Sequence, residues 1–393
     1  FYKKKIFLVY QLACFAFLIA ILLILSNPFD TTILLFNNSY KIDSLSYVMK
    51  LLTLLFGLLV MILSYNYLKI NELNKIEYPI LILCSILGMM VMISSFDLMV
   101  FYIGLELQSL ALYVLASFNR NNTKSSEAGL KYFVLSALSS GLLLYGCSLI
   151  YGFTGSTNFL VISQNLEQAT MGSTFGIVFI LVGLAFKISA VPFHMWSPDV
   201  YEGSPTSVTC FFSIVPKLAA LTVFIRFLYI PFINVFNEWQ IIIIFLSLSS
   251  MILGGVAAIG QSNIKRLMAY SSIGHVGYAL AGLSVGTNDG IQNSLIYIII
   301  YAIMTLGMFS CIFIMQRKNI FYENIEELSG LSKNHPIVSI CMLISLFSLA
   351  GIPPLAGFFA KFYIFMSIIK SQMYFLAIAG LLTTVVSAFY YLR

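Results

Sequence analysis

The sequence predicts an all-α fold, a polytopic bundle of transmembrane helices. Of its 393 residues, 60% are hydrophobic and only 9% are charged, and the mean hydropathy is +0.95. A soluble domain carries roughly 25% charged residues, so this chain has too few charges to cover a water-exposed surface. Its apolar stretches continue for about 20 residues, whereas strands of a membrane β-barrel alternate polar and apolar residues. These observations exclude a soluble enzyme, a nucleic-acid-binding protein and a disordered regulator.

Hydropathy predicts about twelve membrane spans. In chain order they lie near residues 6–26, 46–65, 78–95, 97–118, 130–152, 174–195, 206–229, 240–260, 264–286, 291–315, 336–368 and 372–391. The sixth span runs into Pro192, and the eleventh contains Pro353 and Pro354. Because proline removes a backbone donor and clashes with the preceding turn, both helices are expected to be broken.

The two chain ends carry little sign of processing. Lys3, Lys4 and Lys5 precede the first span, and no small-residue cleavage site follows it, so no cleavable signal is expected. The chain begins at Phe1 and stops at Arg393, directly after an apolar segment. We therefore expect both ends to be truncated.

The basic residues predict the orientation of the spans. If the N-terminal lysines face the cytoplasm or the mitochondrial matrix, alternating spans place most of the 21 lysines and arginines on that side. These are Lys3, Lys4, Lys5, Lys69, Lys75, Arg120, Lys124, Lys131, Lys265, Arg266, Arg317, Lys318, Lys333 and Arg393. The opposite side receives Lys41, Lys50, Arg226 and Lys370. This is the positive-inside distribution, so the net charge of +6 mostly reports topology. Lys265 and Arg266 are interpreted as an interfacial anchor.

Four charged residues belong to neither side of the membrane. Lys187, Lys217 and Lys361 lie within spans, and Glu106 is the acidic residue at the centre of a span. A charge at the bilayer centre costs at least ~2.5–3.5 kcal/mol on insertion scales, so each of these residues needs a reason to be there.

The broken spans suggest an internal repeat. After an N-terminal segment, 1–77, the units 78–229 and 240–391 each contain five spans, and the fourth span of each is broken and carries a lysine, Lys187 or Lys361. Because five is odd, the second copy must lie inverted in the membrane relative to the first. Inverted repeats with paired discontinuous helices are typical of ion and solute translocators.

The four charges predict a proton route. A lysine carries protons only if it can both hold and release one, and a nearby carboxylate stabilises the charged form. A Glu106–Lys187 pair that forms and opens would provide this switch, and Lys187, Lys217 and Lys361 would form a relay with water between them. In the alternative interpretation, Glu106 and Lys187 are a structural ion pair, and backbone carbonyls freed at the breaks cap the other two lysines.

Two histidines are candidate members of the same relay. His194 follows Pro192 at the first break, and His275 lies within a span. Histidine titrates near neutral pH and suits proton transfer along water, but a core histidine hydrogen-bonded to a neighbour is an alternative for each.

Motifs for redox and nucleotide chemistry are missing from the sequence. The six cysteines are scattered singly, with no C-x-x-C pair, and there is no Gly-x-Gly-x-x-Gly or Walker motif. The sequence thus predicts no cofactor, metal or redox centre in this chain. Energy for transport would come from an ion gradient or from partner subunits.

Five motifs carry a family resemblance. They are GLELQSLALYVL (104–115), EAGLKYF (127–133), FKISAVPFHMWSPDVYEGSP (186–205), RLMAYSSIGH (266–275) and AGIPPLAGF (350–358). In these motifs, and over essentially its whole length, the chain resembles the antiporter-like membrane subunits of NADH–quinone oxidoreductase (respiratory complex I), called subunit N in bacteria and subunit 2 in mitochondria.

The resemblance implies a fourteen-helix antiporter-like fold with helices 7 and 12 broken. It implies that Glu106, Lys187, Lys217 and Lys361 are the family's proton-route residues on helices 5, 7, 8 and 12. It further implies neighbouring membrane subunits of complex I as partners, while NADH, FMN, iron–sulfur clusters and quinone act in partner subunits. The location would be the bacterial cytoplasmic membrane or the mitochondrial inner membrane.

Two alternatives stay open. A subunit of a multi-subunit cation/proton antiporter shares the superfamily, but such relatives carry a Thr-Pro-Val-Ser-Ala-Leu-x-His-type run, whereas here Ser204-Pro205-Thr206-Ser207-Val208 leads to Lys217 without a histidine. An inert membrane spacer that moves no protons would be favoured by loss of the four charged residues, and all four are present.

Overall fold

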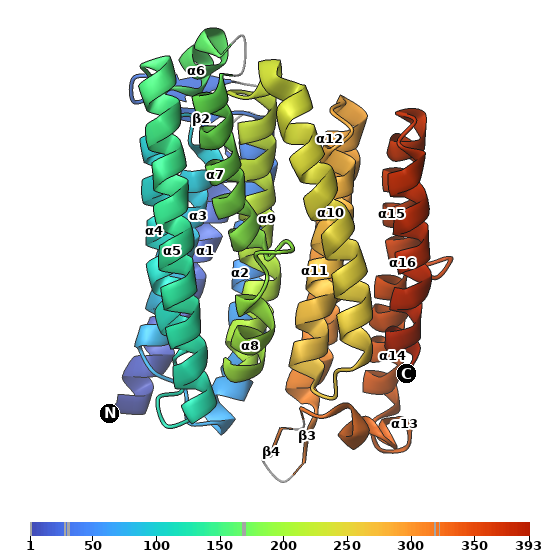
Figure 1. Ribbon diagram of the computed structural model, residues 1–393. Helices are drawn as coiled ribbons and strands as arrows, with labels where there is room; N and C mark the ends of the chain where they lie inside the picture. Colours follow the sequence, from blue (N-terminus) through green and yellow to red (C-terminus); the bar gives the residue numbers. More distant parts are fainter. Residues whose placement is uncertain (1, 27–28, 30–31, 167–169, 318–319, 322) are drawn as a thin grey trace. The chain divides into compact units, whose positions relative to one another are not determined.

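The computed structural model describes residues 2–26, 29, 32–166, 170–317, 320–321 and 323–393 (Figure 1). Lys318 and the side chains of Lys3 and Lys4, which the orientation prediction uses, lie outside the described part. The described residues are overwhelmingly helical, which confirms the all-α prediction.

The chain divides into two compact units, called here the first and the second unit. The first comprises Phe1–Lys187 and Gly203–Phe236, and the second comprises Ile188–Glu202 and Asn237–Arg393. The segment that follows the first break therefore belongs with the C-terminal helices. The inverted relation between the repeats 78–229 and 240–391 stays a prediction.

The first unit is a bundle whose long helices run roughly parallel to one another (Figure 1). Its helices are α1 (Tyr2–Leu25), α2 (Ser44–Ile70), α3 (Glu77–Ser94), α4 (Leu98–Ala116), α5 (Thr123–Thr154), α6 (Phe159–Asn165), α7 (Met171–Ile188), α9 (Thr206–Tyr229) and the 3₁₀ turn η1 (Ile233–Val235). An antiparallel hairpin of β1 (Ile33–Leu35) and β2 (Tyr40–Ile42) connects α1 to α2.

The second unit contains the remaining helices. These are α8 (Trp196–Gly203), which ends where the first unit resumes, α10 (Phe236–Ile259), α11 (Ile264–Leu283), α12 (Asn288–Ile314), η2 (Ile325–Leu328), α13 (Leu331–Asn334), α14 (Pro336–Ala350), α15 (Ala356–Lys370) and α16 (Tyr374–Leu392). A short hairpin of β3 (Gln316–Arg317) and β4 (Ile320–Phe321) follows α12.

Ten helices of the described part are long and apolar enough to cross a membrane, compared with about twelve predicted spans. The other two predicted spans correspond to α11, which is more polar, and to the pair α14 and α15, each 15 residues long. A helix of that length reaches about 22 Å, so the two halves need each other to cross a core about 30 Å thick.

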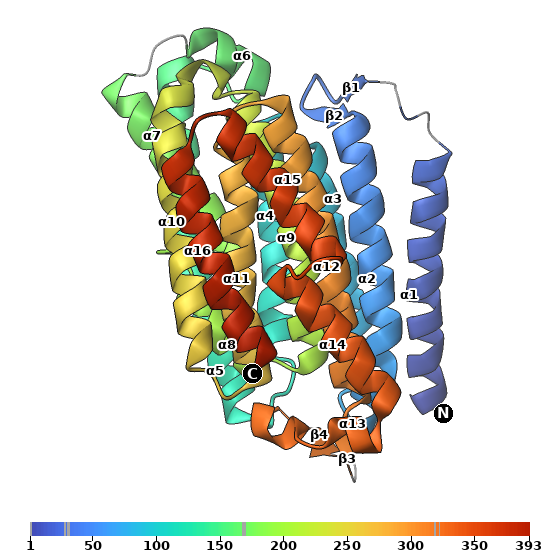
Figure 2. The ribbon, with the colours of Figure 1, turned by 90° about the vertical axis from the view of Figure 1, so that its right-hand side faces the viewer.

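Two expected boundaries were wrong. The fifth span, predicted from 130, begins at Thr123 because Asn122 caps the helix through its side chain, outside the apolar window. The sixth span, predicted to 195, ends as a helix at Ile188, and the short helix α8 after it was not predicted. The eleventh span is broken into α14 and α15, as its prolines predict (Figure 2).

Both breaks occur where the prolines predict them. At the first, Ser189 adopts a left-handed φ of 64° directly after α7, ahead of Pro192. At the second, Gly351 ends α14 with φ 86°, and its N–H donates to the carbonyls of Phe347 and Ser348. Glycine adopts this conformation without the steric cost that other residues meet, so it suits a sharp helix end.

Glycines also let two pairs of helices approach closely. A Cβ at Gly88 of α3 would lie 2.4 Å from the backbone nitrogen of Gln108 in α4. In the second unit, a Cβ at Gly254 of α10 would lie 2.5 Å from the backbone nitrogen of Gly274 in α11. Contacts through small residues are the usual way for membrane helices to pack tightly. They fix the positions of α4 and α11, the helices that carry Glu106 and His275.

Arg226 is the anchor of the first unit rather than a simple span-end charge. It is 1% exposed, and its guanidinium donates to both carboxylate oxygens of Asp43, at 2.7 and 3.1 Å, and to the Ile93 carbonyl at 2.6 Å. Asp43 in turn caps α2 through the N–H of Ser46. Burial alone would raise the pKa of Asp43, but the Arg226 guanidinium beside it holds that pKa below its ordinary value. The cluster ties the ends of α9, α2 and α3 together.

Candidate functional site

Lys187 lies in the last turn of α7 and points among the helices of the first unit. It is 8% exposed, and its ammonium donates hydrogen bonds to Ser109 Oγ at 2.8 Å and to Ser136 Oγ at 2.7 Å. Ser109 belongs to α4 and Ser136 to α5. The ring of Tyr113 lies 5.9 Å from the ammonium, and its hydroxyl donates to Ser136 at 2.6 Å. Neutral hydroxyl groups thus hold this buried cation.

Glu106 lies on α4, on the same helix as Ser109. Its Oε1 atom is buried and has no hydrogen-bond partner within the described residues. The predicted Glu106–Lys187 ion pair is not formed there, since the lysine bonds to serines instead. The switch that the sequence predicts for this pair stays a prediction.

Lys217 lies in the middle of α9, whose membrane-spanning stretch is completely buried. The side chain is 2% exposed. Pro216 precedes it inside the helix. A proline in a helix interior leaves a carbonyl one turn earlier without its N–H partner, which adds polarity near this lysine.

Lys361 lies at the second break, in α15. It is 5% exposed, and its ammonium donates to the carbonyl of Ala350, the last residue of α14, at 2.9 Å. The ammonium also lies 5.1 Å from the centre of the Tyr278 ring. The carbonyl contact is the one expected if a carbonyl freed at the break caps this lysine.

His275 is held from both sides of its ring. Nδ1 is hydrogen-bonded to the Tyr297 hydroxyl at 2.6 Å, and Nε2 to the Tyr391 hydroxyl at 3.0 Å. Ser271 is bonded to the same Tyr391 hydroxyl. His275 and Lys361 line one small cavity of about 10 Å³. This is about the space of a single water molecule, so a water there would connect the two side chains.

His194 is half-buried and belongs to the second unit. Its backbone carbonyl accepts the N–H of Ser197, so the residue starts the turn into α8. Its Nδ1 atom is buried without a partner in the part of the chain that the structure describes.

Lys265 and Arg266 are more than interfacial anchors. Lys265 forms an ion pair with Glu323 at 2.6 Å. The guanidinium of Arg266 forms ion pairs at 3.0 Å with the carboxylates of Asp199 and Glu202, both of which lie on α8. These pairs fasten α8 and the segment before η2 to the start of α11.

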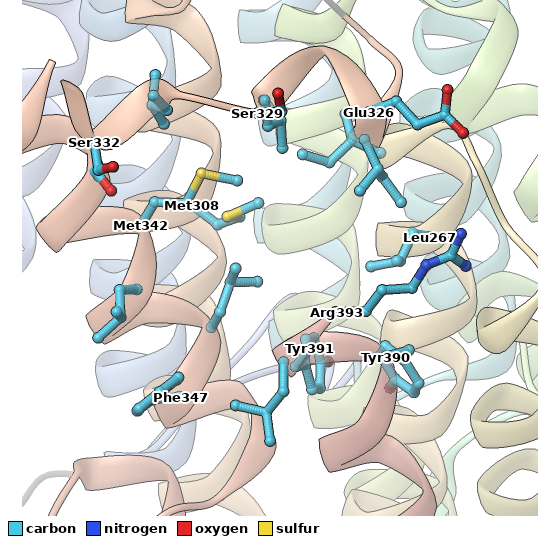
Figure 3. A pocket seen from close by; sticks show the side chains of 18 of the residues that line it. Leu267, Met308, Glu326, Ser329, Ser332, Met342, Phe347, Tyr390, Tyr391 and Arg393 are labelled. Atoms are coloured by element: carbon cyan, nitrogen blue, oxygen red, sulfur yellow. The ribbon is translucent and has the colours of Figure 1, made fainter. Parts of the chain in front are cut away.

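The second unit also has a larger pocket, of about 530 Å³, near the end of α16 (Figure 3). Met308, Met342 and Phe347 contribute apolar side chains, and Glu326 and Arg393 contribute charged ones. None of the six predicted site residues lines it. Tyr391 does line it and is bonded to His275, so this tyrosine separates the pocket from the histidine.

Within the described residues, no group of three or more histidines, cysteines, aspartates and glutamates is placed to hold a metal ion.

Sequence reasoning missed the hydroxyl groups around these cations. Ser109 and Tyr113 follow Glu106 by three and seven residues, a helical spacing that places all three on one face of α4. That pattern was available in the sequence. Other contacts depend on which helices pack together, so no spacing in the sequence indicates them. These are the contacts of Ser136, Tyr297, Tyr391 and the Ala350 carbonyl.

Comparison with known proteins shows the family of the chain. Residues 95–387 match the family model described as NADH:quinone oxidoreductase/Mrp antiporter, TM. The chain is 68% identical over 393 residues to NADH-quinone oxidoreductase subunit N of Pelagibacter ubique, covering 100% of this chain and 83% of the relative. It is 53% identical over 384 residues to the subunit N of Parvibaculum lavamentivorans, covering 97% of this chain and 79% of the relative.

Two solved structures are similar. A chain of respiratory complex I from Thermus thermophilus with bound aureothin has 31% identity and a TM-score of 0.84, covering 98% of this chain and 82% of that chain. A chain of the Mrp complex from Dietzia sp. DQ12-45-1b has 21% identity and a TM-score of 0.85, covering 100% of this chain and 74% of that chain, and at that identity it shows the fold alone. The chain belongs to the subunit N family of NADH-quinone oxidoreductase and is a multi-pass protein of the inner membrane.

Proposed function

We propose that this chain is the proton-translocating membrane subunit N of NADH–quinone oxidoreductase. The observation that carries the proposal is the state of Lys187 and Lys361, two buried cations at helix breaks that neutral oxygen atoms hold. A buried cation paired with a carboxylate, such as Arg226, is fixed in place. A lysine held by neutral acceptors can exchange partners and protons, as a carrier must.

The proposed route uses Lys187, Lys217 and Lys361 in turn, with water between them. Glu106 would set the charge state of Lys187 by closing and opening their contact. His275 would join the route at its far end, through the small cavity that it shares with Lys361. His194, whose Nδ1 has no hydrogen-bond partner among the described residues, is the candidate relay residue at the first break.

The redox chemistry belongs to partner subunits in this proposal. NADH, FMN, iron–sulfur clusters and quinone would act there, and this chain would contact other membrane subunits of complex I and the lipid bilayer. The 68% identity to a subunit N favours this assignment over a multi-subunit cation/proton antiporter.

Lys217→Ala tests the proposal in the assembled complex. Because the change removes a carrier without opening a large cavity, NADH-driven proton uptake by inverted membrane vesicles should fall at least tenfold, about 1.4 kcal/mol, while assembly on native gels stays normal. Lys50→Ala is the matched control, since Lys50 is also buried in the first unit but lies near the start of α2 and donates to the Tyr40 hydroxyl. Unchanged proton uptake per NADH oxidised in Lys217→Ala would refute the relay.

A further inference from the structure

The hydroxyl groups around Lys187 form a defined site with directed hydrogen bonds. Ser109 Oγ donates its own proton to the Leu105 carbonyl of the same helix, at 2.6 Å. Its lone pairs are therefore left to accept from the lysine. Ser136 Oγ accepts from both Lys187 and Tyr113, at 2.7 and 2.6 Å. Ser109 and Ser136 are 1% and 0% exposed, so water does not replace these bonds from the membrane surface.

Glu106 lies next to this site on α4. Three residues along a helix correspond to a rise of about 4.5 Å, so the carboxylate and the Ser109 hydroxyl occupy adjacent turns of one face. A lysine side chain has four rotatable carbon–carbon bonds and reaches over such a distance by changing rotamers. The buried Oε1 atom of Glu106 has no hydrogen-bond partner within the described residues. It is available as a second acceptor for the same ammonium.

We propose that Ser109 and Ser136, with Tyr113 orienting Ser136, are positioning residues that give Lys187 a second resting place away from Glu106. The inference rests on the proposed function and deepens it, because it names the groups that hold the switch open. No covalent bond changes in this step; the ammonium exchanges the Glu106 carboxylate for the two serine hydroxyls. Without the hydroxyls, the ammonium would lose both acceptors of the open arrangement, so the contact with the Glu106 carboxylate would be favoured and the pair would stay closed.

The test removes both hydroxyls in the assembled complex. In the Ser109→Ala/Ser136→Ala variant, NADH-driven proton uptake should fall at least fivefold with normal assembly. Matched controls lie on the same helix as Ser136. Ser139 and Ser140 are each 4% exposed, and their hydroxyls have no hydrogen-bond partner within the described residues. Ser139→Ala and Ser140→Ala should keep uptake within twofold of the wild type, because deleting an unpaired buried hydroxyl removes no bond.

Two further measurements separate positioning from simple support of the fold. Ser109→Thr and Ser136→Thr keep a hydroxyl, and each should retain at least half of the wild-type uptake. The methyl group that threonine adds has to fit in a buried place, so a loss in these variants could come from packing. A double-mutant cycle that combines Ser109→Ala/Ser136→Ala with Glu106→Gln therefore provides an independent readout. If the serines act through the Glu106 contact, the combined fold-loss should be clearly smaller than the product of the separate losses.

Distinct outcomes would overturn the inference. Wild-type uptake in Ser109→Ala/Ser136→Ala would show that Lys187 needs no hydroxyl site, and losses that multiply with Glu106→Gln would assign the serines to packing. Either result leaves the proposed function intact if Lys217→Ala still abolishes pumping. Unchanged pumping in Lys217→Ala would instead refute the proposed function itself.

Discussion

The two helix breaks place their lysines on opposite sides of the interruption. Lys187 precedes the first break, in the last turn of α7, and its acceptors are serine side chains of α4 and α5. Lys361 follows the second break, in α15, and its acceptor is the main-chain carbonyl of Ala350, where α14 ends. Each break therefore supports a buried cation, but the acceptors come from different parts of the chain.

This difference shows which kind of change disturbs each site. The first site depends on the side chains that neighbouring helices present, so serine substitutions dismantle it. The second depends on a carbonyl that the break itself frees, because the last carbonyls of any helix lack an intrahelical donor. Only a change in the backbone of the break removes that acceptor. Variants at the two breaks should therefore differ in their effects on proton uptake.

The largest effect is expected at Gly351. Its φ of 86° strains an L-residue by roughly 1–2 kcal/mol, and an added Cβ would lie 3.0 Å from Lys361 Cδ and 3.3 Å from its Nζ. Gly351→Ala should therefore displace the ammonium and lower NADH-driven proton uptake about tenfold. Gly330→Ala is the matched control, with φ 81° and no atom within 4 Å of the added Cβ. Equal losses in both variants would attribute the effect to backbone strain alone.

Glu106→Gln should affect the first break specifically. Without the carboxylate, Lys187 loses the partner that the closed state requires, so coupled turnover should slow about fivefold, roughly 1 kcal/mol, with assembly unchanged. No ion pair with a carboxylate involves Lys361 within the described residues, so no corresponding acidic variant exists at the second break. Wild-type rates of quinone-linked NADH oxidation in Glu106→Gln would reduce Glu106 to a structural role.

In the second unit, the Tyr297 hydroxyl of α12 is expected to position His275, which shares a small cavity with Lys361. Tyr297→Phe removes the partner of Nδ1, which costs about 1–3 kcal/mol for a buried unpaired group and frees the ring to turn. Proton uptake should fall about threefold relative to Tyr363→Phe, a control at an exposed position of α15. If both variants pump equally, His275 is a packing residue rather than a relay.

The smallest effect is expected at Tyr278. Tyr278→Phe keeps the ring beside the Lys361 ammonium, and Thr383 keeps its own bond to the Gly380 carbonyl, so uptake should stay within about twofold. Tyr278→Leu removes the cation–π contact, worth about 0.5–2 kcal/mol, and should have the larger effect. The reverse order would show that the hydroxyl, not the ring, supports Lys361.

The sequence predicted the all-helical class, the two helix breaks and the six candidate site residues. The prolines at 192, 353 and 354 predicted interruptions that the structure contains. The boundaries of the helices were less accurate, since a cap such as Asn122 extends α5 beyond its apolar window. The roles of Glu106, Lys187, Lys217, Lys361, His194 and His275 stay predictions, and the experiments above test them.

Composition and hydropathy determined the membrane class because the bilayer core admits few charges, so the rare ionisable residues inside spans stand out by their cost. The sequence alone thus isolated three lysines and a glutamate. The contacts of each cation, in contrast, follow from how the helices pack. Ser109 and Ser136 lie 27 residues apart in numbering but meet at one ammonium, because α5 packs beside α4. Hydrogen bonds have a reach of about 3 Å, so their partners follow from helix packing and not from chain order.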